Sequence, residues 1–381
     1  MKVLLVHNNY QTNNIGGEDI VYQNEVTTLK DALGEDSLLI YEVFNDNINR
    51  FTLILSIFFS ITHFLNIFKI VKRNKIDIVH VHNFFPVLTP SVFIAASMAG
   101  AKVVHTLHNF RKWCISGILY REDYGICELC VGKTFPLSGI KFSCYRKSKI
   151  QSLLAQASFS FYKVMRFYNF VDVFFVLTDF QRTKVLSLGV PDEKIVLKPN
   201  GAKPVTHCSK TKSGYIYVGR LEKAKGLEEL LQVWKKLDSN FQLKIIGEGE
   251  LGSLIRDLNL SNVTFMGRRS HSEVVELISS SKYLIQPSLL YETFGLTIIE
   301  AMSCGTPVIG FNIGTRSDFI QHDVSGLLCD PSELEATVIK SMYEVNYLHM
   351  SKQAILVASR FTNERITQVQ IAAYSELLGR S

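Results

Sequence analysis

The amino-acid sequence predicts an α/β protein with two doubly wound domains, each built on a parallel sheet. The chain has 381 residues, of which 47% are hydrophobic, so it is long enough to form two cores. Short β-branched runs alternate with loops and helical stretches, which is typical of a parallel sheet. A loop with Pro204, Ser209 and Ser213 interrupts this alternation, and a second series of strands follows it.

The expected strands are short apolar runs, and those of the first series lie in the N-terminal half. They occupy residues 2–6, 77–82, 102–108, 171–178 and 194–200. The second series occupies residues 215–220, 242–247, 263–267, 283–288 and 307–311. Helical stretches between the strands provide the crossovers that make consecutive strands parallel.

The two series divide the chain near residue 205. We expect an N-terminal domain over residues 1–204 and a C-terminal domain over residues 205–360. Residues 111–146 are expected to form a cysteine-rich insertion in the first domain, and residues 361–381 a C-terminal helix that can cross back to it. Two α/β halves in tandem create an interdomain cleft, which is a common place for a ligand.

The formal net charge of +6 is distributed unevenly. Residues 47–76 contain five Lys or Arg and no acidic residue, and residues 129–171 contain seven and no acidic residue. This asymmetry indicates an anionic surface or substrate facing the first half, and we expect no nucleic-acid partner. The start MKVLLVHNNY lacks the features of a signal peptide, so we expect a cytoplasmic protein whose seven cysteines are thiols or metal ligands.

Residues 51–71 form an apolar run that is long enough to span a bilayer. The run lies between two strands of one expected sheet, which a spanning helix would interrupt. It is therefore either a core helix pair or a half-exposed apolar surface lying on the bilayer. Basic residues border it at Arg50, Lys69, Lys72, Arg73 and Lys75. Residues 145–170 repeat this basic and aromatic character, so we favour peripheral attachment to anionic lipid on the inner face of the cytoplasmic membrane.

Two carboxylates, Glu292 and Glu300, flank the start of a short apolar helix in YETFGLTIIEAMSCGTPVIG. Gly295 precedes this helix and a Gly-Thr-Pro sequence ends it, so it runs from about Gly295 to Cys304. Its first amides form an anion site. Beside a phosphate, the carboxylates are better suited to accept hydrogen bonds from hydroxyl groups, which indicates a sugar nucleotide. The alternative is that Glu300 only pairs with a lysine or caps a neighbouring segment.

Two cations suited to a diphosphate follow the first strand of the second series. Arg220 comes directly after Gly219, and Lys225 lies five residues further on, before a helix. A guanidinium and an ammonium on one diphosphate would stabilise the charge that grows on it as a leaving group. Taken alone, the pattern also fits two solvated loop residues.

Four segments of the second half occur in a specific order and spacing. They are GRLEKAKG, IIGEGE, VTFMGR and PSLLYETFGLTIIEAMSCGTPVI, which begin at residues 219, 245, 263 and 287. Together they resemble the nucleotide-binding half of the family 4 glycosyltransferases, whose hallmark is the E-x7-E pair seen here as Glu292 and Glu300. In the first half VHNNYQTNNIGGED, HTLHNF and KIVLKPNG resemble the family's glycine loop, active-site histidine segment and strand entering the linker. The resemblance covers nearly the whole chain and implies the GT-B fold, with two Rossmann-like domains facing a central cleft.

The resemblance implies a role for each polar residue of the second half. Glu300 would bind the ribose hydroxyls and Glu292 the donor sugar. Arg220 and Lys225 would bind the diphosphate, with Gly219 beside them in the donor-binding set.

The remaining donor contacts implied by the resemblance come from the backbone. The amides of Gly295, Leu296 and Thr297 would bind the distal phosphate. The backbone near Arg268 would meet the base. In the first half Gly17 and the glycine before it can bring the backbone close to a phosphate or an acceptor, because neither carries a Cβ.

His108 is the histidine that the family position singles out. It is expected at the carboxyl end of a strand, where ligands bind such sheets. The resemblance implies that it contacts the donor sugar and is not a nucleophile. The alternative for His108, as for His80, His82 and His105, is an ordinary hydrogen-bonded histidine of the core or surface.

The resemblance also implies the reaction. Family members retain the anomeric configuration, and the leaving diphosphate helps to deprotonate the incoming hydroxyl. The sequence contains no D-x-D motif suited to a catalytic divalent ion, so we expect transfer without a catalytic metal from a UDP- or GDP-linked hexose-type sugar. The segment FNIGTRSDFI departs from the family pattern, and Asp318 stands where family members often have a Glu.

Four cysteines form a cluster outside the common pattern. Cys114, Cys127, Cys130 and Cys144 have the spacing C-x12-C-x2-C-x13-C, and the C-E-L-C core resembles a zinc knuckle. Four thiolates would form a structural zinc site that holds a loop in the acceptor-side domain. The alternative is four reduced thiols whose spacing arose by chance.

Three functions fit these observations. The first is a membrane-peripheral glycosyltransferase that adds a sugar to a lipid-linked saccharide in O-antigen, capsule or exopolysaccharide synthesis. The second is a GT-B sugar-nucleotide epimerase, which the basic apolar helices disfavour because it needs no lipid acceptor. The third is a non-catalytic sugar-nucleotide-binding protein, which the intact set of Glu292, Glu300, Arg220 and Lys225 disfavours.

Overall fold

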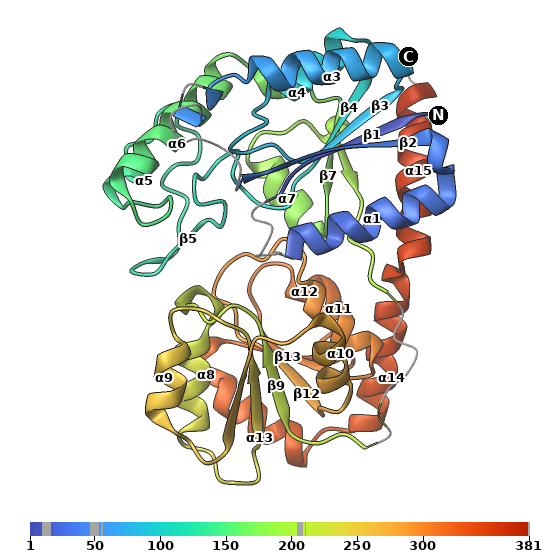
Figure 1. Ribbon diagram of the computed structural model, residues 1–381. Coiled ribbons are helices and arrows are strands. Elements are labelled where there is room, and N and C mark those ends of the chain that lie inside the picture. Colours follow the sequence, from blue (N-terminus) through green and yellow to red (C-terminus); the bar gives the residue numbers. More distant parts are fainter. Residues whose placement is uncertain (10–16, 46–52, 55, 204–208, 210, 380–381) are drawn as a thin grey trace. The chain divides into compact units, whose positions relative to one another are not determined.

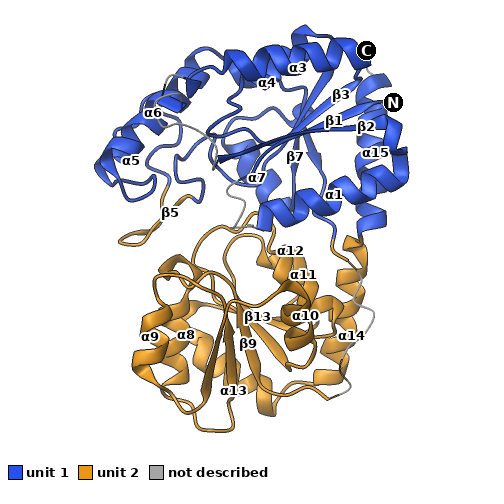
Figure 2. Cartoon of the chain, viewed as in Figure 1, with its two compact units in different colours: residues 1–118, 128–201, 363–381 blue, residues 119–127, 202–362 orange. Residues whose placement is uncertain are grey.

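The computed structural model describes residues 1–9, 17–45, 53–54, 56–203, 209 and 211–379 (Figure 1). The chain forms two compact units (Figure 2). Unit 1 comprises residues 1–118, 128–201 and 363–381, and unit 2 comprises residues 119–127 and 202–362. The boundary expected near residue 205 lies close to the start of the main segment of unit 2 at Ala202.

Unit 1 contains a six-stranded parallel sheet with the order β2-β1-β3-β4-β7-β8. The strands are β1 (Val3–Asn9), β2 (Leu38–Phe44), β3 (Ile78–Asn83), β4 (Lys102–Thr106), β7 (Val173–Val176) and β8 (Ile195–Leu197). All residues of β1 and β3 are buried, including the polar residues at their carboxyl ends, as expected for the central strands of a sheet that is covered on both faces. The strand order changes direction between β1 and β3, and ligands of such sheets bind at the carboxyl ends beside this point.

The helices of unit 1 cover both faces of this sheet, with α3 and α4 on one face and α1 and α15 on the other (Figure 1). They are α1 (Gly17–Leu33), α3 (Ile61–Asn74), α4 (Ser91–Met98), α5 (Ser138–Lys141), α6 (Lys149–Val164), α7 (Asp179–Ser187) and α15 (Asn363–Gly379). The C-terminal helix α15 contributes Tyr374 and Leu377 to the core formed with Val3, Leu5 and Tyr22. The end of the chain is therefore a structural part of unit 1.

Unit 2 contains a second six-stranded parallel sheet, with the order β11-β10-β9-β12-β13-β14. The strands are β9 (Tyr215–Val218), β10 (Leu243–Ile246), β11 (Val263–Gly267), β12 (Tyr283–Gln286), β13 (Val308–Phe311) and β14 (Gly326–Cys329). A small hairpin of β5 (Tyr120–Arg121) and β6 (Gly125–Ile126) is grouped with this unit. The change of direction lies between β9 and β12.

The helices of unit 2 pack around a core that includes the fully buried Trp234 and Tyr283. They are α8 (Leu227–Trp234), α9 (Gly252–Leu258), α10 (His271–Ser279), α11 (Leu296–Ser303), α12 (Arg316–Phe319), α13 (Leu334–Tyr343) and α14 (Tyr347–Ala358). The two Rossmann-like α/β units confirm the predicted fold class. Strands β2 and β14 were not expected from the sequence.

The apolar stretch at residues 51–71 is half buried and half exposed. Residues 51, 52 and 55 lie outside the described residues. Ile57 and Ile67 are buried in unit 1, whereas Ile61 and Leu65 on α3 are 66% and 45% exposed. Throughout the described ranges, no helix is both long and apolar enough to cross a membrane.

Candidate functional site

The loop before α11 has the backbone conformation that an anion site at a helix start requires. Gly295 has a φ of 89°, in the left-handed region that favours glycine, and its carbonyl accepts a hydrogen bond from the amide of Ile298. The helix covers Leu296–Ser303 with Cys304 as its C-cap, so the predicted helix is confirmed. Because the first amides of a helix have no partner within it, those of Leu296 and Thr297 lie where an anion can be bound.

Glu292 lies just before this helix and forms a short ion pair with Lys225. The Lys225 Nζ and Glu292 Oε1 atoms are 2.6 Å apart, and Ser288 Oγ donates to the same oxygen at 2.7 Å. Burial alone would raise the pKa of Glu292, but Lys225, Arg316 and Ser288 together lower it to about 2. Glu292 is therefore ionised at neutral pH and acts as a hydrogen-bond acceptor.

Arg316 is a part of this site that the sequence did not reveal. Its side chain is completely buried, and its guanidinium donates to the carbonyl of Phe311 at 2.6 Å and to the carbonyl of Ser288. The Nη1 atom is buried and has no hydrogen-bond partner among the described residues. Burial lowers the pKa of Arg316 to about 10, and Glu292 opposes this shift. Arg316 is thus a second cation that acts on the Glu292 carboxylate in addition to Lys225, and it is buried.

The position of Lys225 depends on a close approach of two backbone segments. Lys225 ends a 3-10 turn, Lys223–Lys225, and Gly226 follows it with a φ of 70°. A Cβ on Gly226 would lie 1.8 Å from the carbonyl oxygen of Pro287. The amide of Leu289 donates to the carbonyl of Ala224 at 3.0 Å. The glycine of GRLEKAKG is therefore needed to hold this turn against the segment that precedes Glu292.

Glu300 lies within α11 and is paired with a histidine. The distance from His271 Nε2 to Glu300 Oε1 is 2.8 Å, and the Glu300 side chain is only 13% exposed. The hydrogen bond to Glu300 raises the pKa of His271. In the alternative reading Glu300 pairs only with a lysine, and the partner found here is His271, the first residue of α10.

The other predicted donor-binding residues lie in exposed loops of unit 2. Arg220 is 61% exposed and its guanidinium lies 2.6 Å from Glu222, while Arg268 lies 3.1 Å from Glu248. The amide of Gly219 donates to the carbonyl of Ile246 at 3.1 Å, so it is used within the sheet edge.

Asp318 was considered as a substitute for the family's glutamate. It lies exposed in the short helix α12, and its amide donates to the carbonyl of Thr315 at 3.0 Å. The fully buried residue of this helix that approaches Glu292 is Arg316.

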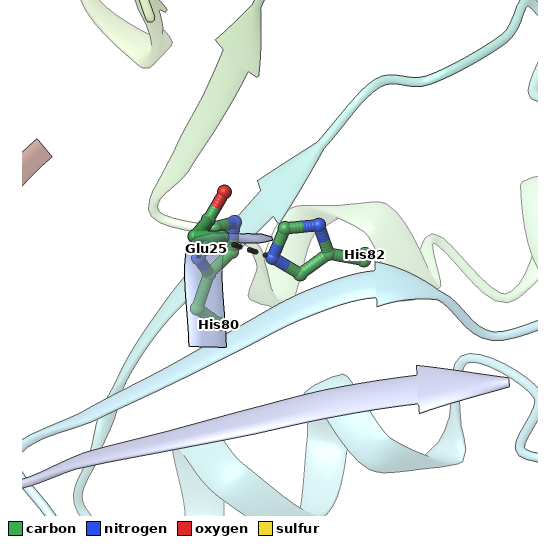
Figure 3. A group of neighbouring side chains, drawn as sticks. All are labelled: Glu25, His80 and His82. Carbon is green, nitrogen blue, oxygen red and sulfur yellow. Dashed lines mark hydrogen bonds and ion pairs between the residues drawn. The ribbon is translucent and has the colours of Figure 1, made fainter. Parts of the chain in front are cut away.

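His108 belongs to a chain of buried polar side chains at the carboxyl edge of the sheet of unit 1. Its Nε2 lies 2.9 Å from His82 Nδ1, and the two rings are stacked with centroids 5.2 Å apart. The other ring nitrogen of His82 lies 3.1 Å from Glu25 Oε1 (Figure 3). Lys198 donates to the second oxygen of Glu25 at 2.5 Å. His108, the histidine that the family position singles out, is therefore a partly exposed member of a longer polar network.

Gly17, the remaining predicted residue of unit 1, is the exposed first residue of α1. A Cβ at this position would have no atom within 4 Å among the described residues. The preceding glycine and the rest of residues 10–16 lie outside the described residues.

Glu25, His80 and His82 have ligand atoms within 4.8 Å of one another, as in a metal site. Hydrogen-bond donors already surround these atoms. Gln370 Nε2 donates to Glu25 Oε1 at 2.5 Å, and Tyr374 Oη lies 2.7 Å from His80 Nδ1. We therefore assign the cluster as a satisfied hydrogen-bond network, since the ammonium of a lysine holds the same carboxylate.

The four cysteines of the predicted zinc site are divided between the two units. Cys127 belongs to unit 2, and Cys114, Cys130 and Cys144 belong to unit 1. Within the described part of unit 1, these three sulfurs do not lie within 4.8 Å of one another. Cys114 Sγ lies 3.1 Å from Ser116 Oγ, and Cys130 is buried.

Comparison with known families assigns both halves of the chain. Residues 25–204 match the model described as Glycosyltransferase Family 4, and residues 203–354 match the model described as Glycosyl transferases group 1. The two matched ranges together extend over most of the chain and meet at the boundary between the first and second strand series.

Relatives with curated names agree with these matches. The chain is 25% identical over 302 residues to the "Uncharacterized 41.2 kDa protein in cps region" of Klebsiella pneumoniae, covering 76% of both chains. It is 27% identical over 179 residues to "O-antigen chain mannosyltransferase B" of Escherichia coli, covering 43% of this chain and 46% of that protein. Several other curated relatives are matched over about a third to a half of their length.

A solved structure supports the fold. The crystal structure of Anabaena Alr3699/HepE in complex with UDP superposes with a TM-score of 0.65 at 16% identity, covering 99% of this chain and all of the other. At that identity the likeness establishes the fold. With the family matches and the two Rossmann-like units, it identifies the chain as a glycosyltransferase of the GT-B fold, whose first half matches family 4 and whose second half matches group 1.

Proposed function

We propose that this enzyme is a retaining glycosyltransferase that moves a hexose-type sugar from a nucleotide diphosphate donor to a lipid-linked saccharide acceptor in surface polysaccharide synthesis. The observation that carries the proposal is the Lys225–Glu292 pair, which stands directly before the amide end of α11. It combines a cation, an acceptor for hydroxyls and an anion site in unit 2. A diphosphate and a sugar joined in one molecule need these three groups together.

In this proposal unit 2 binds the donor. Lys225 and Arg220 bind the diphosphate, and the amides of Gly295, Leu296 and Thr297 bind its distal phosphate. Lys225 has three N–H donors, so it can contact a phosphate oxygen while it still touches Glu292.

The hydroxyl-binding roles fall to the two carboxylates of the E-x7-E pair. Glu300 accepts hydrogen bonds from the ribose hydroxyls while its Oε1 atom is bound to His271. Glu292 accepts hydrogen bonds from hydroxyls of the sugar. The backbone near Arg268 meets the base, and Gly219 keeps the Arg220 loop on the sheet edge. The UDP in the complex of the Anabaena protein supports a uridine nucleotide, with a GDP-linked donor as the alternative.

The proposed transfer is a front-face displacement. The bond between the anomeric carbon and the diphosphate oxygen breaks, and the acceptor oxygen forms its bond to the same face of that carbon. The acceptor hydroxyl gives its proton to the departing diphosphate oxygen, so atoms and charge balance without a general base. Lys225, Arg220 and the α11 amides stabilise the charge that develops on the leaving group, and no catalytic metal is required.

We propose that unit 1, which contains most of the predicted N-terminal domain (residues 1–204) and of its insertion (residues 111–146), binds the acceptor at a membrane surface. Exposed apolar side chains on α3 and α6 support this assignment, among them Ile150 at 80% exposed. Exposed basic residues accompany them at Lys69, Lys72, Arg73, Lys149, Lys163 and Arg166. Anionic lipid on the inner face of the cytoplasmic membrane would bind such a surface. The relatives in a cps region and in O-antigen synthesis support a polysaccharide pathway.

A structural zinc ion at Cys114, Cys127, Cys130 and Cys144 stays a prediction. Binding would require these thiols to come together from two units. Metal analysis of the purified protein tests it, with Cys127→Ser as control. One zinc per wild-type chain that is lost in the variant would support the site, and zinc-free wild type would refute it.

The proposed function is tested by a panel of UDP-, GDP- and other nucleotide sugars. A ligand that binds only the folded protein raises its thermal midpoint, so the true donor is identified by the largest shift. Release of the nucleoside diphosphate is then measured with and without membrane extract. Release that depends on the extract supports the proposal. Conversion of the donor into another nucleotide sugar without net release of the diphosphate supports an epimerase, and binding without turnover supports a non-catalytic protein.

A further inference from the structure

The segment of unit 2 that carries Glu292 is bound at both of its ends by two adjacent residues. Arg316 donates from its guanidinium to the carbonyl of Ser288 at one end. Thr315 donates from Oγ1 to the carbonyl of Phe294 at the other end, at 3.4 Å. Thr315 and Arg316 are both fully buried at the start of α12. We refer to these two residues as the clamp.

The loop before the clamp also packs on the backbone of this segment. A Cβ on Gly314 would lie 3.3 Å from Tyr291 Cα and 3.6 Å from the backbone nitrogen of Glu292. The Arg316 side chain passes β13 at Gly310, where a Cβ would lie 3.1 Å from Arg316 Cδ. Because the two segments are in such close contact, a shift of the clamp would shift the Glu292 backbone with it.

The clamp reaches the carboxylate of Glu292 through Ser288. Ser288 Oγ donates to Glu292 Oε1 at 2.7 Å, and Arg316 binds the carbonyl of the same serine. Arg316 Nε donates to the carbonyl of Phe311 at 2.6 Å, so the guanidinium joins Ser288 to β13. Hydrogen bonds from a charged donor in a fixed fork geometry define position as well as adding energy. The place of the Glu292 oxygens therefore depends on Arg316.

Arg316 also supplies a charge that stabilises the ionised form of Glu292. Burial lowers the pKa of Arg316 to about 10, so the guanidinium stays charged near neutral pH. The other charged or titratable groups that face Glu292 are Lys225 and Tyr217, and Glu292 raises the pKa of Tyr217. In the proposed function Lys225 is shared with the diphosphate, whereas the buried Arg316 stays beside Glu292.

We propose that Thr315 and Arg316 are positioning residues that hold Glu292 in the orientation needed to bind the donor sugar, and that they thereby set how strongly a nucleotide sugar is preferred over its free nucleotide. The proposal rests on the proposed function, in which Glu292 binds the sugar and Glu300 binds the ribose. Loss of the clamp weakens the contact with the sugar, while the contacts of the nucleotide with α11 remain. The ratio of the two affinities reports this effect, and an ordinary loss of stability would not change it.

Substitutions at Thr315 test the clamp with little change in shape. Thr315→Val removes the hydroxyl group and Thr315→Ser keeps it. The matched control is Thr337→Val in the same unit, because Thr337 Oγ1 donates to the carbonyl of Glu333 at 2.9 Å. Calorimetric titration of the full chain compares UDP and GDP with hexose conjugates of each. The conjugate that wild type prefers should bind about 3- to 10-fold more weakly to Thr315→Val, as for the loss of one hydrogen bond.

The free nucleotide should bind equally well to wild type and Thr315→Val. Thr315→Ser should restore most of the preference for the conjugate, and Thr337→Val should behave as wild type. Equal weakening of nucleotide and conjugate in Thr315→Val would overturn the proposal.

Substitutions at Arg316 separate its charge from its hydrogen bonds. Arg316→Gln keeps a donor without the charge, and Arg316→Lys keeps the charge without the fork. We expect the preference for the conjugate to fall about 10-fold or more in Arg316→Gln and to be partly restored in Arg316→Lys, in line with the loss of a hydrogen bond from a charged donor. An unchanged preference in folded Arg316→Gln would contradict the proposal. The Thr315 variants decide the question if Arg316→Gln does not fold.

Amide hydrogen exchange without ligand separates this proposal from the proposed function. Peptides that cover residues 288–294 should exchange faster in Thr315→Val than in wild type and be unchanged in Thr337→Val. Unchanged exchange in Thr315→Val would show that there is no clamp. If no conjugate binds wild type more tightly than its free nucleotide, the proposed sugar contact fails, and the exchange rates still test the clamp. If wild type shows the preference and both Thr315→Val and Arg316→Gln keep it, the clamp assignment fails alone.

Discussion

Glu292 is the carboxylate of unit 2 that two cations and a hydroxyl group stabilise together. It is held by Lys225 and Ser288 and lies near the buried Arg316. Its neighbours lower its pKa from 4.5 to about 2 although burial opposes the shift. A group whose pKa is lower in the folded than in the unfolded state stabilises the fold above its unfolded pKa.

This shift predicts a specific loss of stability in acid. The contribution of Glu292 is about 3 kcal/mol above its unfolded pKa, and it is lost as the pH falls from 4.5 toward 2. Thermal midpoints of wild type and Glu292→Gln, measured from neutral pH to pH 3, check this. The difference between the two thermal midpoints should become smaller as the pH falls. A constant difference would show that the ion pair of Glu292 does not stabilise the fold.

Arg316 predicts a second effect at the scale of one residue. Arg316→Met leaves the carbonyls of Phe311 and Ser288 without their buried donor and removes a cation near Glu292. We expect the free energy of unfolding to fall by about 3 kcal/mol, as when one member of a buried charged group is removed. Arg256→Met is the matched control, because Arg256 is exposed in the same unit. Equal thermal midpoints for the two variants would contradict the proposal that the buried Arg316 guanidinium stabilises unit 2.

The sequence alone predicted one or two members of each polar network, and it did not predict the residues that hold them. Glu292, Glu300 and His108 were predicted because they lie in recognisable motifs. Arg316 and His271 were missed because their partners are distant in the sequence, so only the folded chain brings them together.

At the scale of elements, the loops at the carboxyl edge of the unit 2 sheet depend on glycines for close backbone contact. Gly226 allows the Lys225 turn to approach Pro287, and Gly247 has a φ of 145° and would clash with the Gly219 carbonyl if it carried a Cβ. These contacts tie the loops after β9 and β10 to the segment that carries Glu292. The geometry of the proposed donor site therefore depends on main-chain packing.

Two glycine substitutions separate steric contact from backbone strain. Gly226→Ala places a Cβ 1.8 Å from a carbonyl oxygen, whereas Gly267→Ala has a similar φ of 66° but meets no atom of the described residues within 4 Å. We expect Gly267→Ala to cost about 1 kcal/mol from its left-handed backbone. Gly226→Ala should cost clearly more in chemical denaturation and also weaken nucleotide binding. A similar loss of stability in both variants would mean that the turn can move to accommodate the Cβ of Gly226→Ala, and it would contradict the steric role of Gly226.

Elements with a strong local pattern were predictable. The glycine before α11 and the Gly-Thr-Pro after it bounded that helix within a residue. The strands β1, β3 and β9 were predicted because each contains a short run of buried β-branched, aliphatic or aromatic residues. Strand β2 was missed because most of its residues are only partly buried, so its sequence alternates less clearly.

At the scale of the whole molecule, both units contain a six-stranded parallel sheet, although the strand orders differ, and in each unit the polar network lies at the carboxyl edge near the change of direction. The α15 helix completes the core of unit 1 and also supplies Gln370 and Tyr374 to its buried network. Truncating the C-terminus would therefore disturb the histidine chain as well as the core.

The exposed apolar and basic surface of unit 1 predicts binding to anionic vesicles. Ile150→Asp on α6 should weaken sedimentation with vesicles that contain anionic lipid, because it replaces an 80% exposed apolar side chain with a negative charge. Leu348→Asp is the matched control, since Leu348 is 74% exposed on α14 of unit 2. Equal loss in both variants, or equal binding to zwitterionic vesicles, would contradict a specific membrane surface on unit 1.

The most direct test of the account is the rate of sugar transfer to lipid acceptors in membrane extract by wild type and Glu292→Ala, with the donor found by thermal shift. The exposed ion pair of Lys236 and Glu335 provides the control variant Glu335→Ala. We expect transfer to fall about 100-fold or more in Glu292→Ala, in line with the loss of a group that binds the transition state, and to be unchanged in Glu335→Ala. A wild-type rate in Glu292→Ala would contradict the assignment of this site as the donor site.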